Sequence, residues 1–466
     1  MNRRRFLSAA LAPAFLRAQT RSAQRPNIVF LLADDQRWDS LGCMSDPFVK
    51  SPHIDRMASE GVTFQRNFVT TAICVSSRAS IFTGLYSHSH AIWKFTNSFP
   101  EDKWSRSYPA LLKQAGYRTG FVGKFGIDGG KPPISTFDFW RGFQGQGHYF
   151  PKKDGKTHLT TVMGDQAIEF LRGSTQTQPF CLSVSFKAPH VQDEDPKQFL
   201  FDPQDAALYR DLQIPMPQTA SPDYIRQLPL SVQRSEARRR WAVRFATPEL
   251  YQESVKGYYR LITGIDRQVG RIREELDQLK LSSNTVIIYT SDNGFYLSEH
   301  GLAGKWFMHE ESIRTPLIIH DPRLPASRRD ARNSAATLNI DVAPTILDFA
   351  GITPPPSMQG RSLTPLVQGR STSWREDFFY EHHFDNGGWI PSTEGVRNSR
   401  YKYTVYTDEP SVTEELYDLE VDMHEETNLA RDPRFSAHLA ELRTRRQTWL
   451  RHLDRWSPDS PWKDPD

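Results

Sequence analysis

Five segments along the chain fit strands, and the first of them is a continuous apolar run rich in β-branched residues. They occupy residues 27–33, 117–122, 180–186, 284–290 and 314–320. Runs of this length without polar alternation are typical of strands buried on both faces of a parallel sheet. Segments that fit helices separate them, at residues 52–61, 109–116, 160–172, 250–281 and 339–350. The alternation predicts an α/β fold with a large, mostly parallel mixed sheet flanked by helices.

The pattern changes after about residue 365. Residues 377–383, 395–406 and 415–419 have the pattern of short alternating strands, and residues 437–453 that of a closing helix. We therefore expect a small C-terminal antiparallel sheet with a helix, over residues 366–466, beside a catalytic domain over residues 25–365. Residues 191–245 are proline-rich and charged without clear periodicity. We expect them to form a long excursion that borders the functional site.

The first 24 residues have the pattern of an export signal and a short linker. Arg3, Arg4 and Arg5 precede Phe6 and a short alanine-rich stretch, which resembles a twin-arginine signal. The alternative is a basic N-terminal tail, but we favour export to the periplasm or the medium. No later segment approaches the roughly 18 apolar residues of a membrane-spanning helix.

Composition narrows the function classes. Lys plus Arg (58) nearly balances Asp plus Glu (55), and a net charge of +3 argues against a nucleic-acid partner. The basic cluster at residues 234–244 is local and predicts a solvated helix face. The cysteines Cys43, Cys74 and Cys181 are too few for a disulfide scaffold in a chain of 466 residues. One of them is therefore a candidate for chemistry, and Cys74 has the most suggestive surroundings.

Polar residues follow the apolar runs where the predicted strands end. Asp34 and Asp35 follow the first run, and Asp292 and Asn293 follow the fourth. Because ligands bind beyond the carboxyl ends of strands in open α/β sheets, we expect these oxygens to converge. Three carboxylates and an amide carbonyl suit Ca²⁺ or Mg²⁺ better than zinc. Of the two, Ca²⁺ better tolerates an irregular arrangement of oxygen ligands. Taken singly, each pair is equally consistent with a turn or a helix cap.

The segment around Cys74 predicts a helix start. Small polar residues, including Ser76, precede an apolar stretch, so Cys74 lies at or near the N-terminus, where anions are favoured. Arg78 falls about one turn further on. The alternative is a buried cysteine beside a surface arginine. Positive charge and hydrogen-bond donors for the oxygens of a sulfate or phosphate ester come from a second set of residues: Arg78, Lys124, His190 and Lys305.

Together these motifs resemble the type I sulfatases, the formylglycine-dependent members of the alkaline phosphatase superfamily. The matching stretches are residues 27–36, 74–84, 123–124, 188–190, 291–294 and 299–301, with Lys305, and they follow the family's order. Residues 400–403 and 415–419 resemble the family's C-terminal subdomain. The resemblance implies an alkaline phosphatase-like fold and hydrolysis of sulfate esters.

The resemblance also implies roles for single residues. Cys74 would be oxidised by a formylglycine-generating maturation enzyme, and the hydrated aldehyde would attack sulfur. One Ca²⁺ ion would be held by the residues that match the family's metal ligands, Asp34, Asp35, Asp292 and Asn293, with the modified Cys74 as a further ligand. Arg78 would steady the formylglycine hydroxyls, and Lys124 and Lys305 would clamp sulfate oxygens. His190 would face the leaving oxygen as donor or general acid.

Two positions depart from the family pattern. Ser76 stands where the family usually has proline or alanine two residues after the cysteine. Gly126 stands where the family often has a histidine, which is thought to help regenerate the aldehyde. Either another group replaces that histidine, with His148 and His300 as candidates, or the chain belongs to a subgroup that lacks it.

We therefore predict hydrolysis of sulfate esters, on sulfated carbohydrates. The carbohydrate part rests on the export signal and on aromatic residues available for sugar stacking, Trp140, Tyr149, Trp306 and Trp389. One alternative is a phosphomonoester, phosphodiester or phosphonate hydrolase on the same scaffold. Another is a catalytically silent anion-binding homologue with an unmodified Cys74.

Overall fold

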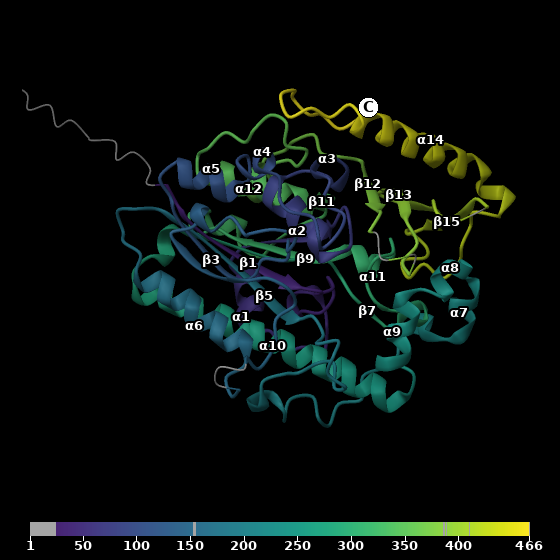
Figure 1. The fold of residues 1–466 in the computed structure, drawn as a ribbon, viewed down its shortest axis with the longest axis horizontal. Coiled ribbons are helices and arrows are strands. Elements are labelled where there is room, and N and C mark those ends of the chain that lie inside the picture. The colour runs from purple at the N-terminus through teal and green to yellow at the C-terminus, as the bar shows by residue number, and fades with distance from the viewer. Residues whose placement is uncertain (1–24, 152–154, 385–386, 388, 410, 466) are drawn as a thin grey trace, which may run out of the picture.

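A nine-stranded sheet forms the centre of the computed structural model, which describes residues 25–151, 155–384, 387, 389–409 and 411–465 (Figure 1). The predicted export signal, residues 1–24, lies outside the described residues. The strand order is β10-β2-β9-β6-β1-β5-β3-β4, and β11 pairs with β2. The strands are β1 (Asn27–Asp34), β2 (Val62–Phe68), β3 (Arg118–Lys124), β4 (Phe139–Phe143), β5 (Phe180–Pro189), β6 (Thr285–Ser291), β9 (Arg314–His320), β10 (Ala331–Asn333) and β11 (Thr337–Leu338).

The sheet is mostly parallel, as the apolar runs predicted. β1 lies between β5 and β6 and is parallel to both, with Leu31 opposite Val184 on one side and Tyr289 on the other. Every residue of β1 is buried. β9 is antiparallel to its two neighbours, β2 and β6. The prediction of a large mixed sheet in an α/β fold is therefore confirmed.

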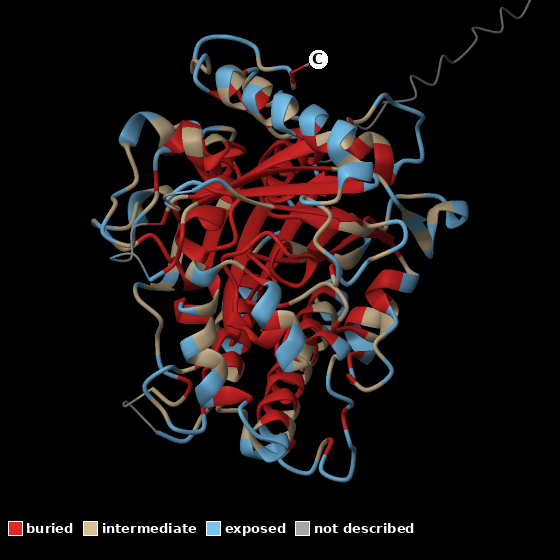
Figure 2. Cartoon of the chain, turned by 90° about the vertical axis from the view of Figure 1, so that its right-hand side faces the viewer, coloured by how far each residue is buried: buried red, intermediate tan, exposed pale blue. Residues whose placement is uncertain are grey.

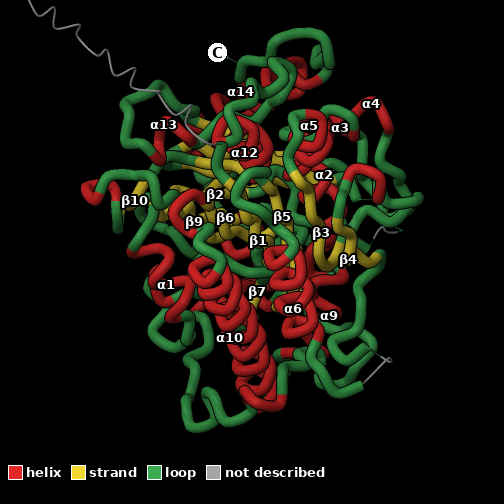
Figure 3. Tube along the Cα trace, turned by 90° about the vertical axis from the view of Figure 1, so that its left-hand side faces the viewer, coloured by secondary structure: helices red, strands yellow, loops and turns green. Residues whose placement is uncertain are grey.

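Helices cover both faces of this sheet (Figures 1 and 3). Ile28, Phe30 and Leu32 face the side of α2, α5 and α12, whereas Val29 and Leu31 face α1, α6 and α10. Figure 2 shows the buried centre and the exposed outer turns. The helices are α1 (Pro52–Ser59), α2 (Cys74–Thr83), α3 (Ser87–His90), α4 (Glu101–Trp104), α5 (Tyr108–Gln114), α6 (Leu159–Arg172), α10 (Pro248–Gln278), α11 (Glu310–Ile313), α12 (Val342–Phe349) and α13 (Thr364–Val367). Among the described residues, no helix is long and apolar enough to cross a membrane.

A four-stranded antiparallel sheet and a helix follow, as predicted. They are β12 (Asp377–His382), β13 (Thr393–Asn398), β14 (Tyr401–Tyr406), β15 (Thr413–Asp418) and α14 (Ser436–Leu453). The single strand predicted for residues 395–406 is wrong, because the chain reverses between β13 and β14. Asn398 stabilises the reversal by accepting hydrogen bonds from the backbone N–H groups of Arg400 (2.9 Å) and Tyr401 (2.6 Å).

The excursion at residues 191–245 contains three short helices that its composition did not predict. They are α7 (Pro222–Gln227), α8 (Leu230–Gln233) and α9 (Glu236–Arg244). The prediction that residues 234–244 form a solvated face is wrong for Arg244, whose side chain is 1% exposed. Arg244 is buried because Asp193 and Gln198 accept its hydrogen bonds. A short hairpin, β7 (Tyr296–Leu297) and β8 (Ala303–Gly304), lies beside α9.

A buried ion pair connects the catalytic region to the C-terminal sheet. The two carboxylate oxygens of Asp341 accept hydrogen bonds from the guanidinium of Arg375 at 2.6 and 2.7 Å, and both side chains are at most 2% exposed. Because Arg375→Ala leaves a buried carboxylate unpaired, we expect the free energy of unfolding to fall by about 3–5 kcal/mol.

Urea denaturation measures this change, and Arg361→Ala is the matched control. Arg361 makes a partly exposed ion pair with Asp464, so its loss is expected to cost at most about 1 kcal/mol. Equal losses in the two variants would contradict the assignment of Asp341 and Arg375 as the stabilising connection.

Candidate active site

Polar residues that follow the parallel strands meet at one edge of the large sheet. β1 ends at Asp34, and its neighbours β5 and β6 run into His190 and Asp292. β3, beside β5, ends at Lys124. All four side chains are buried. The common direction of these strands brings their carboxyl ends together, where open α/β sheets bind ligands.

Cys74 lies in the first turn of α2, as the sequence predicted. Ile73 before it is extended, and its carbonyl accepts the Ser77 N–H at 2.9 Å. Cys74 is 2% exposed, and its Sγ lies 4.0 Å from Lys305 Nζ. Burial raises the pKa of the Cys74 thiol, although the charges of Lys124 and Lys305 oppose this shift. The thiol is therefore protonated at neutral pH.

Arg78, one turn along α2, connects the helix to the strand ends. Its Nε donates to Asp292 Oδ2 at 2.8 Å, and its Nη1 donates to the backbone carbonyl of Lys124 at 2.7 Å and to Ser185 Oγ. Its Nη2 lies 3.2 Å from Asp34 Oδ2. Arg78 is thus a buried, multiply bonded residue rather than a surface arginine.

Two lysines bring positive charge to the carboxylates. Lys124 Nζ donates to Asp34 Oδ2 at 2.5 Å and to Gln146 Oε1 at 2.7 Å, and Lys305 Nζ donates to Asp35 Oδ1. Burial alone would lower the pKa of each lysine. Together, the negatively charged neighbours outweigh burial and raise both pKa values, with Asp34 the largest of them at Lys124 and Asp35 the largest at Lys305. Both are therefore charged at neutral pH.

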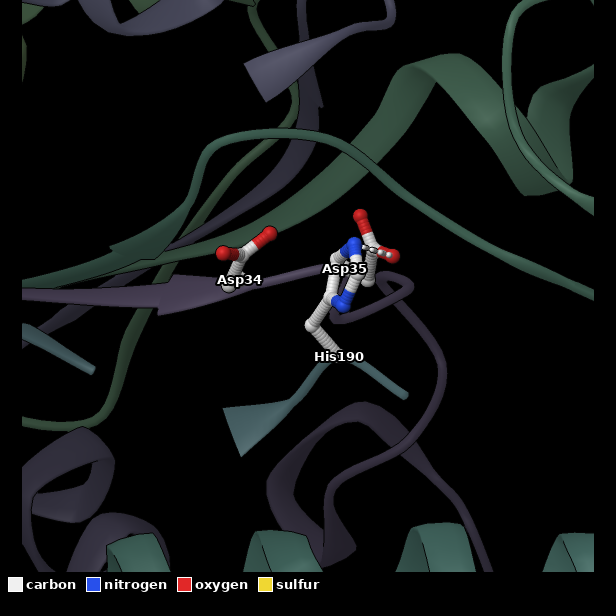
Figure 4. Close-up of side chains that lie close together, drawn as sticks. All are labelled: Asp34, Asp35 and His190. Carbon is white, nitrogen blue, oxygen red and sulfur yellow. Dashed lines mark ion pairs between the residues drawn. The ribbon is translucent and has the colours of Figure 1, made fainter. Parts of the chain in front are cut away.

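His190 lies beside the acidic pair (Figure 4). Its Nδ1 donates to the carbonyl of Val191 at 2.6 Å, because a carbonyl can only accept. Its Nε2 points to Asp35 and lies 3.7 Å from Oδ2. Burial, with the charge of Lys305, lowers the pKa of His190 well below its usual value.

The acidic cluster fits a hard divalent cation. Asp34 Oδ1 and Asn293 Oδ1 are buried acceptors that have no hydrogen-bond partner among the described residues. The ligand atoms of Asp34, Asp35 and His190 lie within 4.8 Å of one another, and so do those of Asp34, Cys74 and Asp292. Carboxylate and amide oxygens left free in this way are ligands of the kind that Ca²⁺ prefers.

The pKa shifts of these carboxyl groups also favour a bound cation. Burial and the charge of Asp34 raise the pKa of Asp292 to about 6. Burial likewise raises the pKa of Asp35, against the charge of Lys305. Burial opposes ionisation of Asp34, but Lys124 and its other cationic neighbours hold its pKa well below the usual value. A bound divalent cation would favour the charged form of all three.

The two departures from the family pattern have different structural contexts. Ser76 is buried, and its hydroxyl donates to the backbone carbonyl of Ile92 at 2.7 Å. Gly126 has a left-handed φ of +79°, and a Cβ there would lie 2.6 Å from Arg78 Cδ. A histidine therefore does not fit at position 126 while Arg78 keeps its place.

Within the residues that the structure describes, neither candidate replacement histidine contacts Cys74. His148 is largely exposed and lies 3.2 Å from Glu194. His300 is buried, stacks on His309 with ring centroids 4.4 Å apart, and has Lys402 as a charged neighbour. Their contacts are thus with other parts of the chain.

Gln146 is a site residue that the sequence reasoning missed. It accepts a hydrogen bond from Lys124, and because an ammonium can only donate, the Gln146 NH₂ group points the other way. Gly145 and Gly147, both with positive φ, flank it. The sequence signal that could have identified Gln146 as a site residue is its position between two glycines. Of the four aromatic residues considered for sugar stacking, Trp389 is the most exposed, at 56%, whereas Trp306 is 4% exposed.

A parallel sheet whose carboxyl edge holds buried acids, lysines and a helix N-terminus defines a hydrolase of anionic esters. The sulfatase family model matches residues 26–352, and the model for the C-terminal region of N-sulphoglucosamine sulphohydrolase matches residues 298–451. The chain belongs to the sulfatase family of the alkaline phosphatase superfamily and is a sulfuric ester hydrolase.

Its relatives include enzymes of named activity. An N-acetylglucosamine-6-O-sulfatase of Bacteroides thetaiotaomicron is 27% identical, with 91% of this chain and 86% of the relative covered. The solved structure of a protein in complex with its substrate D-glucosamine-2-N,6-O-disulfate has a TM-score of 0.80 to this chain at 26% identity. The match covers 94% of this chain and all of that protein. A phosphonate monoester hydrolase of Agrobacterium radiobacter shares the fold, with a TM-score of 0.71 at 22% identity. The match covers 92% of this chain and 95% of that enzyme.

Proposed function

We propose that this enzyme hydrolyses sulfate esters of carbohydrates, with a Cα-formylglycine made from Cys74 as the nucleophile and one bound Ca²⁺ ion. The observation that carries the proposal is the surroundings of Cys74. Buried lysines, Arg78 and carboxylates with a free acceptor oxygen gather around it. The sulfated-glucosamine relatives support the carbohydrate part of the proposal.

The buried thiol argues for modification of Cys74. A protonated thiol is a poor nucleophile, since the thiolate is the reactive form. One hydroxyl of a hydrated formylglycine would attack sulfur and displace the alcohol. The second hydroxyl would then lose its proton and re-form the aldehyde, and sulfate would leave with the oxygen that attacked. Arg78, fixed by Asp292 and the Lys124 carbonyl, orients these hydroxyls from within the same helix. Oxidation requires a maturation enzyme that accepts Ser76 in the recognition sequence.

The other residues bind the ester and carry protons. Four acidic and amide side chains would hold Ca²⁺, namely Asp34, Asp35, Asp292 and Asn293. The ion would supply positive charge beside the sulfate oxygens. Lys124 and Lys305, both protonated, bind the sulfate oxygens and stabilise the charge that develops in the transition state. His190 presents Nε2 to the site. The neutral imidazole holds its proton on Nδ1, so His190 would donate to the leaving oxygen in its imidazolium form, which a bound anionic ester favours.

Steady-state rates on a substrate panel test the proposal. The panel contains 4-nitrophenyl sulfate, 4-nitrophenyl phosphate, phenyl phosphonate monoester and several sulfated hexoses, including N-acetylglucosamine 6-sulfate. We expect the highest kcat/KM on a sulfated hexose. A large preference for phosphate or phosphonate would assign the enzyme to the alternative hydrolases. Binding of sulfated hexoses without turnover would indicate the silent homologue.

We expect Lys124→Ala to lower kcat for sulfate hydrolysis by about 10²–10³-fold, because a preorganised charge beside the sulfate oxygens is removed. Asp34 would also lose its ammonium partner. Steady-state kinetics on the best sulfated hexose measure the loss. Lys113→Ala is the control, since Lys113 makes a surface ion pair with Asp138. A Lys124→Ala enzyme as active as the Lys113→Ala enzyme would rule out the assigned role.

A further inference from the structure

Helix α9 carries two arginines to the side of the active site where His190 and Lys305 lie. Arg240 and Arg244 are one turn apart and therefore share a face of the helix. α9 packs beside β8, which directly precedes Lys305. Both guanidinium groups reach Asp193, three residues after His190, at 3.3 Å from Arg240 and 2.5 Å from Arg244. The helix thus joins the two segments that carry these active-site residues.

Arg240 is held in place from two directions. Its Cζ lies 5.1 Å from the ring centroid of Trp306, which immediately follows Lys305. Its Nε donates to Glu236 Oε1 at 2.7 Å. Trp306 is itself fixed, with a φ of +92° that is rare for a bulky residue and a carbonyl that accepts from the Tyr380 hydroxyl at 2.5 Å. The guanidinium is therefore oriented before any ligand arrives.

Asp193 is held by a buried partner. Arg244 is 1% exposed, and it donates to Asp193 Oδ1 and to Gln198 Oε1. Asp193 and Arg240 keep 39% and 22% of their side chains exposed. In the part of the chain that the structure describes, Asp193 Oδ2 and Arg240 Nη2 make no hydrogen bond. A free acceptor and a free donor are thus presented side by side next to the active site.

We propose that Asp193 and Arg240 form a sugar clasp that binds hydroxyl groups of the substrate's hexose ring. A hydroxyl both donates and accepts, so it can donate to Asp193 while accepting from Arg240. Trp306 and Arg244 position the two side chains. This inference rests on the proposed function and sharpens it: the preferred substrate is a sulfated hexose with free hydroxyl groups, rather than an aryl sulfate.

Kinetics of Arg240→Ala on two substrates test the clasp. We expect kcat/KM for the best sulfated hexose to fall by about 10–100-fold, mainly through KM, because a charged hydrogen bond to the ring is lost. The rate on 4-nitrophenyl sulfate should stay within about twofold, since an aryl group has no hydroxyl to bind. Arg240→Lys, which keeps the charge but not the planar fork, should fall between wild type and Arg240→Ala.

Arg239→Ala is the matched control. Arg239 lies on the same helix and also pairs with Glu236, but its side chain is 62% exposed. We expect it to leave both rates unchanged. Equal losses on both substrates in Arg240→Ala, or no loss on the hexose, would overturn the clasp. If no sulfate ester is cleaved, the proposed function fails, and calorimetric binding of the sulfated hexose to wild type and Arg240→Ala still decides the clasp.

Discussion

We expect Cys74→Ala to lower kcat for sulfate ester hydrolysis by about 10⁴-fold or more, the largest effect of any single substitution in the chain. The variant keeps the lysines, Arg78 and the acidic cluster, so it should still bind the sulfated hexose. What it lacks is the nucleophile. Cys181→Ala is the control, because Cys181 is also a buried free cysteine but lies on β5 outside the site. We expect Cys181→Ala to retain activity.

Mass spectrometry of the peptide that contains Cys74 separates a chemical role from a structural one. In protein produced with a maturation enzyme, we expect formylglycine at position 74, and activity in proportion to its fraction. Unmodified cysteine throughout a fully active preparation would refute the mechanism. The residue at position 76 affects how completely Cys74 is oxidised to formylglycine. Ser76→Ala restores a family-like sequence, so we expect Cys74 to be oxidised at least as completely in that variant. The Ile92 carbonyl would then lose its hydrogen bond, at a cost of about 1 kcal/mol in stability.

The strands at the centre of the sheet were predictable from sequence. β1, β5 and β6 are covered on both faces, so apolar residues make up most of their sequences. β2 and β4 were missed for the opposite reason. β4 is an edge strand whose side chains are only partly buried, and β2 contains Gln65 and Arg66 in its middle. A strand whose polar side chains find partners elsewhere in the fold leaves no clear apolar pattern.

The acidic cluster was predictable because it depends only on strand ends. Once β1 and β6 are parallel neighbours, Asp34 and Asp292 must lie close together. Gln146 and Arg240 were not predictable in this way. Each lies on a segment between strands, and its position depends on how that segment packs against the rest of the chain. The contact of Gly126 with Arg78 likewise follows from tertiary packing and not from any local pattern.

We expect removal of the divalent ion to abolish activity reversibly and to lower the melting temperature of the enzyme. Without the ion, Asp34 Oδ1 and Asn293 Oδ1 are buried acceptors with no partner, and three carboxyl groups repel one another. A Ca²⁺ ion that binds only the folded chain would contribute about 2.7 kcal/mol of stability at a hundredfold excess over Kd. Thermal melting in chelator and after Ca²⁺ addition measures this directly. Mg²⁺ should restore less of the melting temperature, because it requires a regular octahedral arrangement of ligands.

Asn293→Ala assigns the effect to this cluster. The substitution removes a free oxygen ligand and leaves Asp34, Arg78 and Cys74 in place, so we expect a much smaller rise in melting temperature on Ca²⁺ addition. Asp165→Asn is the control, since Asp165 is an exposed acid paired with Arg271. It should respond to Ca²⁺ as the wild type does. An Asn293→Ala enzyme with the full Ca²⁺ shift would place the ion elsewhere, and wild-type activity in chelator would exclude a catalytic ion altogether.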